Sequence, residues 1–295
     1  MSATPSLEEL RPRAFAVAYR MLGSVSEAED IVQEALLRVH LALQQGERIE
    51  SPHAYLSTVV TRLCIDQLRS ARVRRESYVG EWLPEPLVDD GRSDPADHAE
   101  MADSLSLAFL VLLESLTPEQ RAAFLLREVF DYPYAEIAAI IDTGQDNTRQ
   151  LVSRARKYVD ERRPRFEASQ QEREQLASSF LAAINDGDLH ALEKLLAQDV
   201  VVHADGGGKV RVIPRPVQGR AKVARLLLAV AMKRSAFGGW FMRQAQVNGQ
   251  TGVTASDTVG NLIAVLVLDI ADGHISAVRA IVNPDKLHHL DQQTS

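Results

Sequence analysis

The sequence predicts a multidomain protein in which two all-α domains precede one α+β domain. Over roughly the first 165 residues, apolar side chains recur at the 3.6-residue spacing of amphipathic helices. Within that part, residues 116–163 read as two short helices, a glycine turn and a basic helix. After about residue 196 the spacing becomes that of strands, and Asp272-Gly273 marks a hairpin. Helices followed by a mostly antiparallel sheet indicate an α+β domain.

The composition is that of a soluble globular protein. The chain has 295 residues, of which 45% are hydrophobic and 25% charged, enough for two or three domains. No apolar run approaches a membrane span, and the first residues lack the apolar core of a signal peptide. We therefore expect a cytoplasmic protein that does not contact a membrane.

Cysteine and histidine usage does not favour a metal site or a cofactor. Cys64 is the single cysteine and lies in an apolar helical pattern, so it is expected to be a small buried side chain. The histidines show no metal-ligand spacing. We expect neither a metal nor a cofactor.

Four segments follow from these patterns. Residues 6–78 are helical, 79–100 form an irregular linker, 101–166 are helical again, and 171–295 form the tail. Ser26 and Glu29 are expected to form a capping box in the first segment, and Ser51-Pro52 to open its long helix. In the linker, Trp82 and Leu83 are too apolar to be left fully solvated.

Residues 116–163 predict a helix-turn-helix. Thr117 and Gln120 form a capping box with Pro118 at the first helical position. A turn at Asp142-Thr143-Gly144 leads into the basic helix, the arrangement that places a helix in the major groove. Arginine-rich helix faces are also commonly only solvated, so this segment alone leaves both interpretations open.

The overall charge argues against a protein that binds DNA tightly without a partner. The formal net charge is -7 and the pI about 5.7, whereas proteins that neutralise many phosphates are usually basic. Positive charge is concentrated between Arg62 and Arg75 and between Arg149 and Arg165. Either these local clusters suffice, or the affinity for DNA is shared with a partner.

The segment Ser26–Arg38 resembles region 2 of bacterial RNA polymerase sigma factors, and Thr61–Arg69 completes the pattern downstream. The helix-turn-helix is similar to sigma region 4. Two matches in this order, joined by a loose linker, resemble an extracytoplasmic-function sigma factor. The resemblance implies a non-enzymatic initiation factor whose partners are promoter DNA and core RNA polymerase, at its β′ clamp helices and β flap.

The resemblance assigns three sets of contacts. The alternative is that these residues bind no partner and are ordinary solvated or core side chains. Acidic and apolar side chains would meet polymerase, where charge complementarity sets specificity and association rate: Glu29, Asp30, Val32, Gln33, Glu34 and Leu36. The -10 element would meet phosphate-binding arginines and two residues able to stack on an unpaired base: His53, Tyr55, Arg62, Arg69, Arg72, Arg74 and Arg75. The -35 element would meet the start of the basic helix: Asp146, Asn147, Arg149, Gln150, Ser153, Arg154, Arg156 and Lys157.

Two residues of the basic helix region depart from the usual family pattern. Gly144 stands where a serine often begins the helix, and the polar Thr148 occupies an apolar position. The promoter sequence that this chain reads is therefore expected to be unusual.

The tail resembles the SnoaL-like branch of the nuclear transport factor fold, a curved sheet wrapped by helices. Three motifs match the sigma-J type of sigma factor, whose tail controls the sigma core in cis. The residues concerned are Trp82, Leu83 and Pro84 in the linker, Asp205, Gly206, Gly207, Gly208 and Lys209 in the tail, and Asn283, Pro284, Asp285, Lys286 and Leu287 near the end.

Other uses of the tail stay open at this point. The glycine run lacks the Walker spacing, which disfavours nucleotide binding. His203 and Asp205, with Trp240, Phe241 and Met242, would line a cavity in an isomerase or hydrolase, although a structural His203 is the simpler interpretation. The third reading is a sensor that binds an unidentified small-molecule ligand in the cavity.

Overall fold

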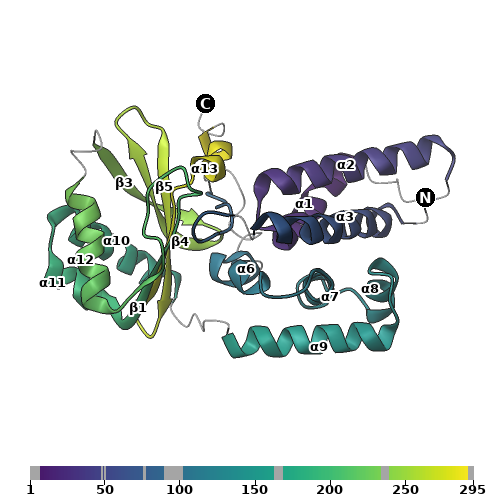
Figure 1. Cartoon of the computed structure of the whole chain (residues 1–295). Coiled ribbons are helices and arrows are strands. Elements are labelled where there is room, and N and C mark those ends of the chain that lie inside the picture. Colours follow the sequence, from purple (N-terminus) through teal and green to yellow (C-terminus); the bar gives the residue numbers. More distant parts are fainter. Residues whose placement is uncertain are drawn as a thin grey trace. The chain divides into compact units, whose positions relative to one another are not determined.

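The computed structural model describes residues 7–47, 49, 51–75, 78–89, 102–162, 169–233 and 239–291, with side chains in the helix that ends at Arg75 described up to Ser70. The chain divides into two compact units. The first unit comprises residues 1–77 and 110–163, and the second comprises residues 78–109 and 164–295. Figure 1 shows the elements of each unit.

Among the described residues of the first unit, all regular secondary structure is helical. Its elements are α1 (Leu7–Leu22), α2 (Val25–Gln44), α3 (Pro52–Arg75), α7 (Pro118–Glu128), α8 (Tyr134–Ile140) and α9 (Gln145–Arg162). Two short helices, α5 (Ala102–Leu105) and α6 (Leu107–Leu113), come between α3 and α7 in the sequence. Helices α1, α2 and α3 pack together around buried side chains such as Ala18, Val39 and Val60. Cys64 is fully buried in α3, as predicted.

The start of α2 differs from the predicted capping box. Ser24, not Ser26, is the N-cap, and its hydroxyl accepts a hydrogen bond from the Glu27 amide. Gly23 has a φ of 67°, and Ser24 follows it with extended backbone, so Ser24 is the residue placed to meet the free amides. The prediction failed because one serine two residues away offers the same local chemistry.

The helix-turn-helix forms as predicted. Thr117 and Gln120 make the reciprocal capping box that starts α7. Between α8 and α9 the chain turns at Asp142, whose φ is 54°. The small core beneath the motif contains Ala123, Ile137 and Val152.

The tail in the second unit is an α+β fold, as predicted. Its helices are α10 (Gln170–Asp186), α11 (Leu189–Leu195), α12 (Arg220–Met232) and α13 (Pro284–Asp291). Its strands are β1 (Leu196–Asp205), β2 (Val217–Gln218), β3 (Trp240–Val247), β4 (Gln250–Asp257), β5 (Leu262–Ala271) and β6 (His274–Ile281). The sheet has the order β2-β1-β6-β5-β4-β3, and only the β1–β6 pair is parallel among the described strands.

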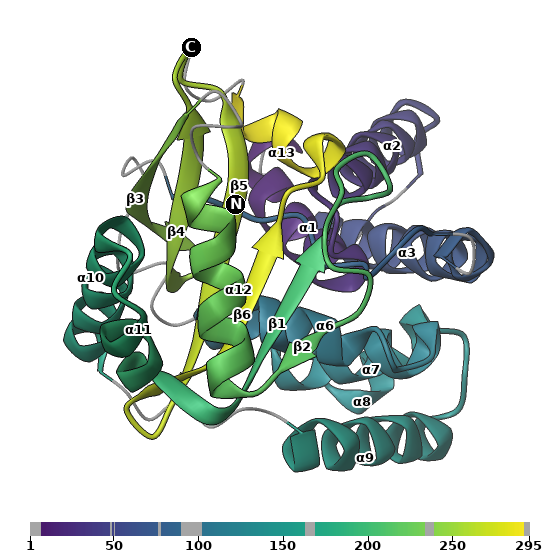
Figure 2. The same ribbon diagram turned by 60° about the vertical axis from the view of Figure 1, so that its left-hand side comes forward.

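Helices α10, α11 and α12 cover one face of this sheet, and Figure 2 shows β1 and β6 side by side beneath α12. The core on that face includes Phe180, Val202 and Val278. Because side chains alternate along a strand, His203 and Asp205 project from the opposite face of β1.

Candidate functional site

The exposed face of α9 carries every residue predicted to meet the -35 element. All eight are exposed, while Thr148, Val152 and Val159 turn inward. The buried Thr148 hydroxyl donates to the Gly144 carbonyl at 3.0 Å. This hydrogen bond explains how a polar side chain is accommodated at an apolar position of the motif.

Two arginines of this face are held by neighbours within the helix-turn-helix. Arg149 bonds Asp146 at 2.9 Å, and its guanidinium lies 5.5 Å from the centre of the Tyr134 ring. Arg156 bonds Glu128 at 2.5 Å. Both pairs are solvent-exposed, so they orient the guanidinium groups at little energetic cost to a competing DNA contact.

Helix α3 presents part of the predicted -10 surface to the helix-turn-helix instead of to solvent. Arg62 donates to the carbonyls of Ile140 and Ala139, at 2.9 and 3.0 Å. Arg69 donates to Glu119 at 2.8 Å, and these contacts raise the pKa of Arg69.

The remaining predicted -10 residues differ in accessibility. His53 is exposed, and Tyr55 is half-buried. The side chains of Arg72, Arg74 and Arg75 lie outside the described residues. The structure therefore brings Arg62 and Arg69 together with the helix-turn-helix and leaves His53 open to solvent.

Two buried polar contacts join α1 and α3 to the helix-turn-helix. The Ser57 and Tyr132 hydroxyls lie 2.7 Å apart. The Arg121 guanidinium donates to the Met21 carbonyl at 2.7 Å and to Glu114 at 2.8 Å. Burial lowers the pKa of Arg121 to about 9. The sequence patterns did not indicate these contacts, because each partner lies 75 or more residues away except Glu114.

The predicted polymerase-binding surface on α2 needs one correction. Glu29, Asp30 and Gln33 are exposed and Glu34 and Leu36 are half-buried, whereas Val32 is only 1% exposed and belongs to the core. Val32 faces inward because α2 packs on α1 and α3 along the row Ala28, Val32, Ala35 and Val39. The structure therefore contradicts the prediction that Val32 supplies contact area.

Exposed apolar area on α2 comes from residues that the sequence reasoning missed. Leu37 is 51% exposed and Leu41 43% exposed. They lie four residues apart, so they share one side of the helix. This i, i+4 pair of leucines next to an acidic stretch was the signal available in the sequence.

In the second unit, Asp205 is the centre of a buried contact between the tail and the linker segment, which we define as residues 78–89. Its Oδ1 accepts from the Tyr78 hydroxyl at 2.6 Å and from the Gly207 amide at 3.0 Å. Its Oδ2 accepts from the Leu83 amide at 2.8 Å and from Lys286 Nζ at 2.7 Å. Asp205 is fully buried, so these four donors replace water around the carboxylate.

Lys286 connects all three sigma-J motifs. Besides Asp205, its ammonium donates to the Leu83 carbonyl and lies 4.2 Å from the centre of the Trp82 ring. Asn283 donates to the Tyr78 hydroxyl at 3.0 Å. The pKa of Tyr78 is raised, chiefly by burial and to a smaller extent by the hydrogen bond to Asp205.

Further hydrogen bonds join backbone atoms of the linker segment to the tail. Asn248 accepts from the Leu87 amide at 2.9 Å and donates its own amide to the Leu87 carbonyl at 2.7 Å. The Asp89 amide donates to the Gln246 carbonyl at 2.9 Å. His289 Nε2 donates to the Pro86 carbonyl at 2.9 Å. Sequence reasoning missed Asn248 and His289 because their side chains bond backbone atoms of the linker segment, and backbone atoms leave no motif in its sequence.

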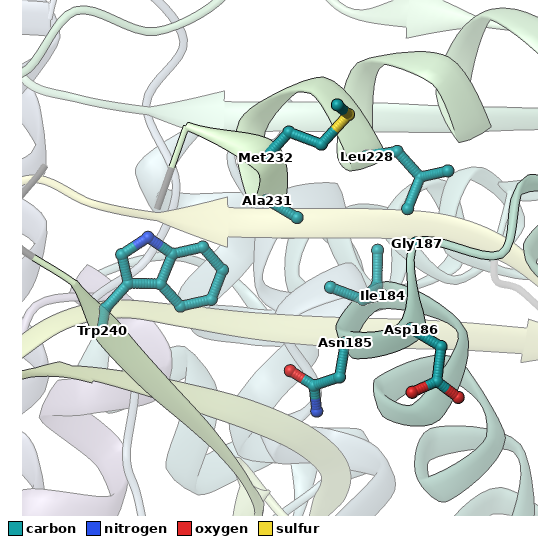
Figure 3. Close-up of a pocket in the computed structure, with 8 residues that line it drawn as sticks. All are labelled: Ile184, Asn185, Asp186, Gly187, Leu228, Ala231, Met232 and Trp240. Atoms are coloured by element: carbon teal, nitrogen blue, oxygen red, sulfur yellow. The ribbon is translucent and has the colours of Figure 1, made fainter. Parts of the chain in front are cut away.

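The tail has a pocket on the face covered by helices, of about 170 Å³. Figure 3 shows its lining residues, from the ends of α10 and α12 and the start of β3. They are Ile184, Asn185, Asp186, Gly187, Leu228, Ala231, Met232 and Trp240.

This pocket corrects the predicted cavity. Trp240 lines it, but His203 and Asp205 do not, because they project from the opposite face of the sheet. Phe241 is 60% exposed, and Met242 packs against the core. Asp186 is the pocket's one titratable lining residue. An acid–base pair is therefore not assembled there.

The two helical regions and the exposed basic helix define the class of protein. Residues 7–74 match the sigma-70 region 2 family, and residues 106–159 match the sigma-70 region 4 family. The chain is 38% identical over 289 residues to the ECF RNA polymerase sigma factor SigJ of Mycobacterium tuberculosis, covering 95% of this chain and 91% of that protein. It is also 32% identical over 293 residues to the probable ECF RNA polymerase sigma factor SigI of the same species, covering 94% and 93% of the two chains.

The crystal structure of Mycobacterium tuberculosis SigJ is similar over the whole fold. The TM-score is 0.76 at 35% sequence identity, and the match covers 95% of this chain and 96% of that one. The chain belongs to the extracytoplasmic-function (ECF) RNA polymerase sigma factors. Within the described residues, we find no helix that combines the length and the apolar character needed to cross a membrane.

Proposed function

We propose that this chain directs core RNA polymerase to specific promoters for transcription initiation and that its SnoaL-like tail modulates this activity in cis. The observation that carries the first part is the exposed polar and basic face of α9 in a chain that also contains sigma region 2. Side chains such as Arg149 and Gln150 have the donors and acceptors needed to read guanine and adenine edges.

The α3 helix would meet the -10 element, with His53 and Tyr55 near the unpaired bases and the arginines on phosphates. On α2, the exposed residues Glu29, Asp30 and Gln33 would meet the β′ clamp helices, with Leu36 adding apolar area. The helix-turn-helix would meet the β flap. The net charge of -7 is consistent with an affinity for DNA that is shared with polymerase.

The contact of the tail with the linker segment supports regulation in cis. The linker segment lies between regions 2 and 4 in the sequence. When it is bound to the tail, less of the connecting chain is free, so the distance allowed between the two regions is restricted. Promoter elements have a fixed spacing, and both regions must reach theirs at once. A fully buried Asp205 with four donors makes this contact specific in geometry.

Run-off transcription with core polymerase tests both parts. The full-length chain is compared with a chain cut near residue 170 and with Asp205→Asn and Asp285→Asn variants. We expect promoter-specific transcripts from the full-length chain and altered yields from the others, with polymerase binding intact. If neither the full-length nor the shortened chain gives a promoter-specific transcript, the proposed function in initiation is wrong.

A second candidate function for the tail is ligand sensing, and the pocket beside Trp240 favours it. Its lining combines apolar side chains such as Leu228 and Trp240 with the polar Asn185 and Asp186, which suits a small compound that is part apolar and part polar, whereas a single lining carboxylate gives no acid–base pair for an isomerase or hydrolase. A thermal-shift screen against small compounds of this kind tests this function. A hit whose stabilisation disappears in Trp240→Ala supports sensing, and turnover of a compound by the isolated tail would instead restore the enzyme.

A further inference from the structure

One contact between the linker segment and the tail depends on a titratable side chain. His203 Nδ1 on β1 lies 2.6 Å from Glu81 Oε1. The two side chains are 21% and 29% exposed, so solvent protons reach both. Histidine is the side chain whose charge ordinarily changes between pH 5 and 8. The contact is an ion pair when the imidazole is protonated and an ordinary hydrogen bond when it is neutral.

The charged side chains that the described sheet places beside His203 belong to the tail. Arg279 on β6 is its register partner, and Arg279 Nε donates to Asp269 on β5 at 2.9 Å. Burial raises the pKa of Asp269, while Arg279 and, more weakly, His203 oppose that shift. On the other side of β1, β2 contributes only the uncharged Val217 and Gln218.

Glu81 is the charge near His203 that moves with the linker segment. Arg279 and Asp269 are in the tail's own sheet, so they stay beside His203 whether or not the linker segment is docked. Their influence on the imidazole is therefore largely the same in both states. The difference between docked and undocked states comes mainly from the carboxylate of Glu81.

We propose that the proton on His203 controls how tightly the linker segment docks on the tail, so that docking is a pH-responsive device. By linkage, a state that holds a proton more tightly is favoured as pH falls. Docking should therefore be strongest at the acid end of the histidine range and should weaken as pH rises. The consequence for transcription rests on the proposed cis-regulation, but the docking equilibrium itself does not.

The neighbouring contacts do not share this dependence. Asp205 and Lys286 form a buried pair that contains no histidine, the side chain whose charge ordinarily changes between pH 5 and 8. His289 donates through Nε2 to the Pro86 carbonyl, and neutral imidazole with its proton on Nε2 already makes that bond. His289 is therefore a matched control, because it touches the same linker segment without facing a linker carboxylate in the described contacts.

Hydrogen exchange of the full-length chain measures docking directly. The amides of Leu83, Leu87 and Asp89 donate to tail atoms, so their protection reports the docked state. After correction for intrinsic exchange, we expect about threefold more protection at about pH 5.5 than at about pH 8, a modest factor because the pair is partly exposed. His203→Gln and Glu81→Gln should each remove this difference, whereas His289→Gln should retain it.

Equal corrected protection at both pH values in the wild-type chain would overturn the proposal, as would a pH effect that survives in both His203→Gln and Glu81→Gln. Glu81 is in the linker segment and not in the tail's sheet. Glu81→Gln can therefore still test the proposal if His203→Gln lowers the stability of the tail. Run-off transcription at the same two pH values separates the two proposals. Docking that follows pH while promoter output does not would leave the pH-responsive contact standing and count against cis-regulation.

Discussion

Arg62 Nε donates to the Ile140 carbonyl at 2.9 Å, although the two residues are 78 positions apart. The acceptor lies at the end of α8, where the free carbonyls of a helix carry partial negative charge. The guanidinium predicted to meet promoter phosphates is thus engaged by the helix-turn-helix. Nε and Nη2 cannot bond promoter phosphates while they donate to the α8 carbonyls, so a phosphate contact through these two nitrogens requires α3 and α8 to separate.

The Arg69–Glu119 pair offers a way to loosen this contact without altering a predicted DNA-binding residue. We expect Glu119→Gln to raise run-off transcription about twofold, because an exposed ion pair contributes about 0.2–1 kcal/mol. Glu136→Gln, an exposed carboxylate on α8, is the control and should leave the yield unchanged. A lower yield from Glu119→Gln would show that the pair assists initiation.

The same pair predicts an acid-sensitive contact. Burial alone would raise the pKa of Glu119, but its backbone hydrogen bond and Arg69 outweigh burial, so the pKa is lowered from 4.5. A carboxyl group with a lowered pKa stabilises the folded state above its unfolded pKa and loses that contribution as pH falls through the folded value. Thermal unfolding should therefore show a larger loss of stability below pH 4.5 in the wild-type chain than in Glu119→Gln. Parallel losses in the two chains would contradict this assignment.

Arg149 lies near the start of α9, and Arg149→Ala should weaken promoter-specific binding by about 1–3 kcal/mol, the usual cost of one lost base-edge contact. Binding to scrambled DNA should change much less. The comparison is made by titrating holoenzyme with cognate and scrambled -35 DNA, with Arg162→Ala at the far end of α9 as the matched arginine control. Equal losses on the two DNAs would assign Arg149 to the phosphate backbone.

Gly207 is required by both its backbone and its surroundings. Its φ is 58°, and a Cβ added there would lie 2.3 Å from the Asn283 amide nitrogen. Gly207→Ala should therefore displace Asn283 from Tyr78 and destabilise linker docking by about 2 kcal/mol, combining left-handed strain with one lost hydrogen bond.

Gly187→Ala is the matched control for this change. Gly187 also has a positive φ, 69°, but a Cβ there meets nothing within 4 Å. Hydrogen exchange at Leu83 and Leu87 should rise in Gly207→Ala and stay near wild type in Gly187→Ala. Similar exchange in the two variants would mean that backbone strain alone explains the effect.

Local chemistry allowed much of the fold to be predicted. The capping box at Thr117, the buried Cys64 and the Asp272-Gly273 hairpin are confirmed, because each depends on residues within a turn or two of one another. The α12 helix and the β3 strand were not foreseen. Their boundaries carry weaker signals, and α12 begins at Arg220 after Gly219, which offers no side-chain cap.

The sequence by itself determined the order of the helical regions and the tail, the exposed polar face of α9, and the motifs that meet at Lys286. Only the tertiary structure decided that Val32 faces the core, that Arg62 binds the carbonyls of α8, and that His203 faces Glu81 rather than the pocket beside Trp240. The physical reason is that periodicity and capping act over a few residues. Which face of a helix or strand meets which distant partner is settled by packing between segments far apart in the chain.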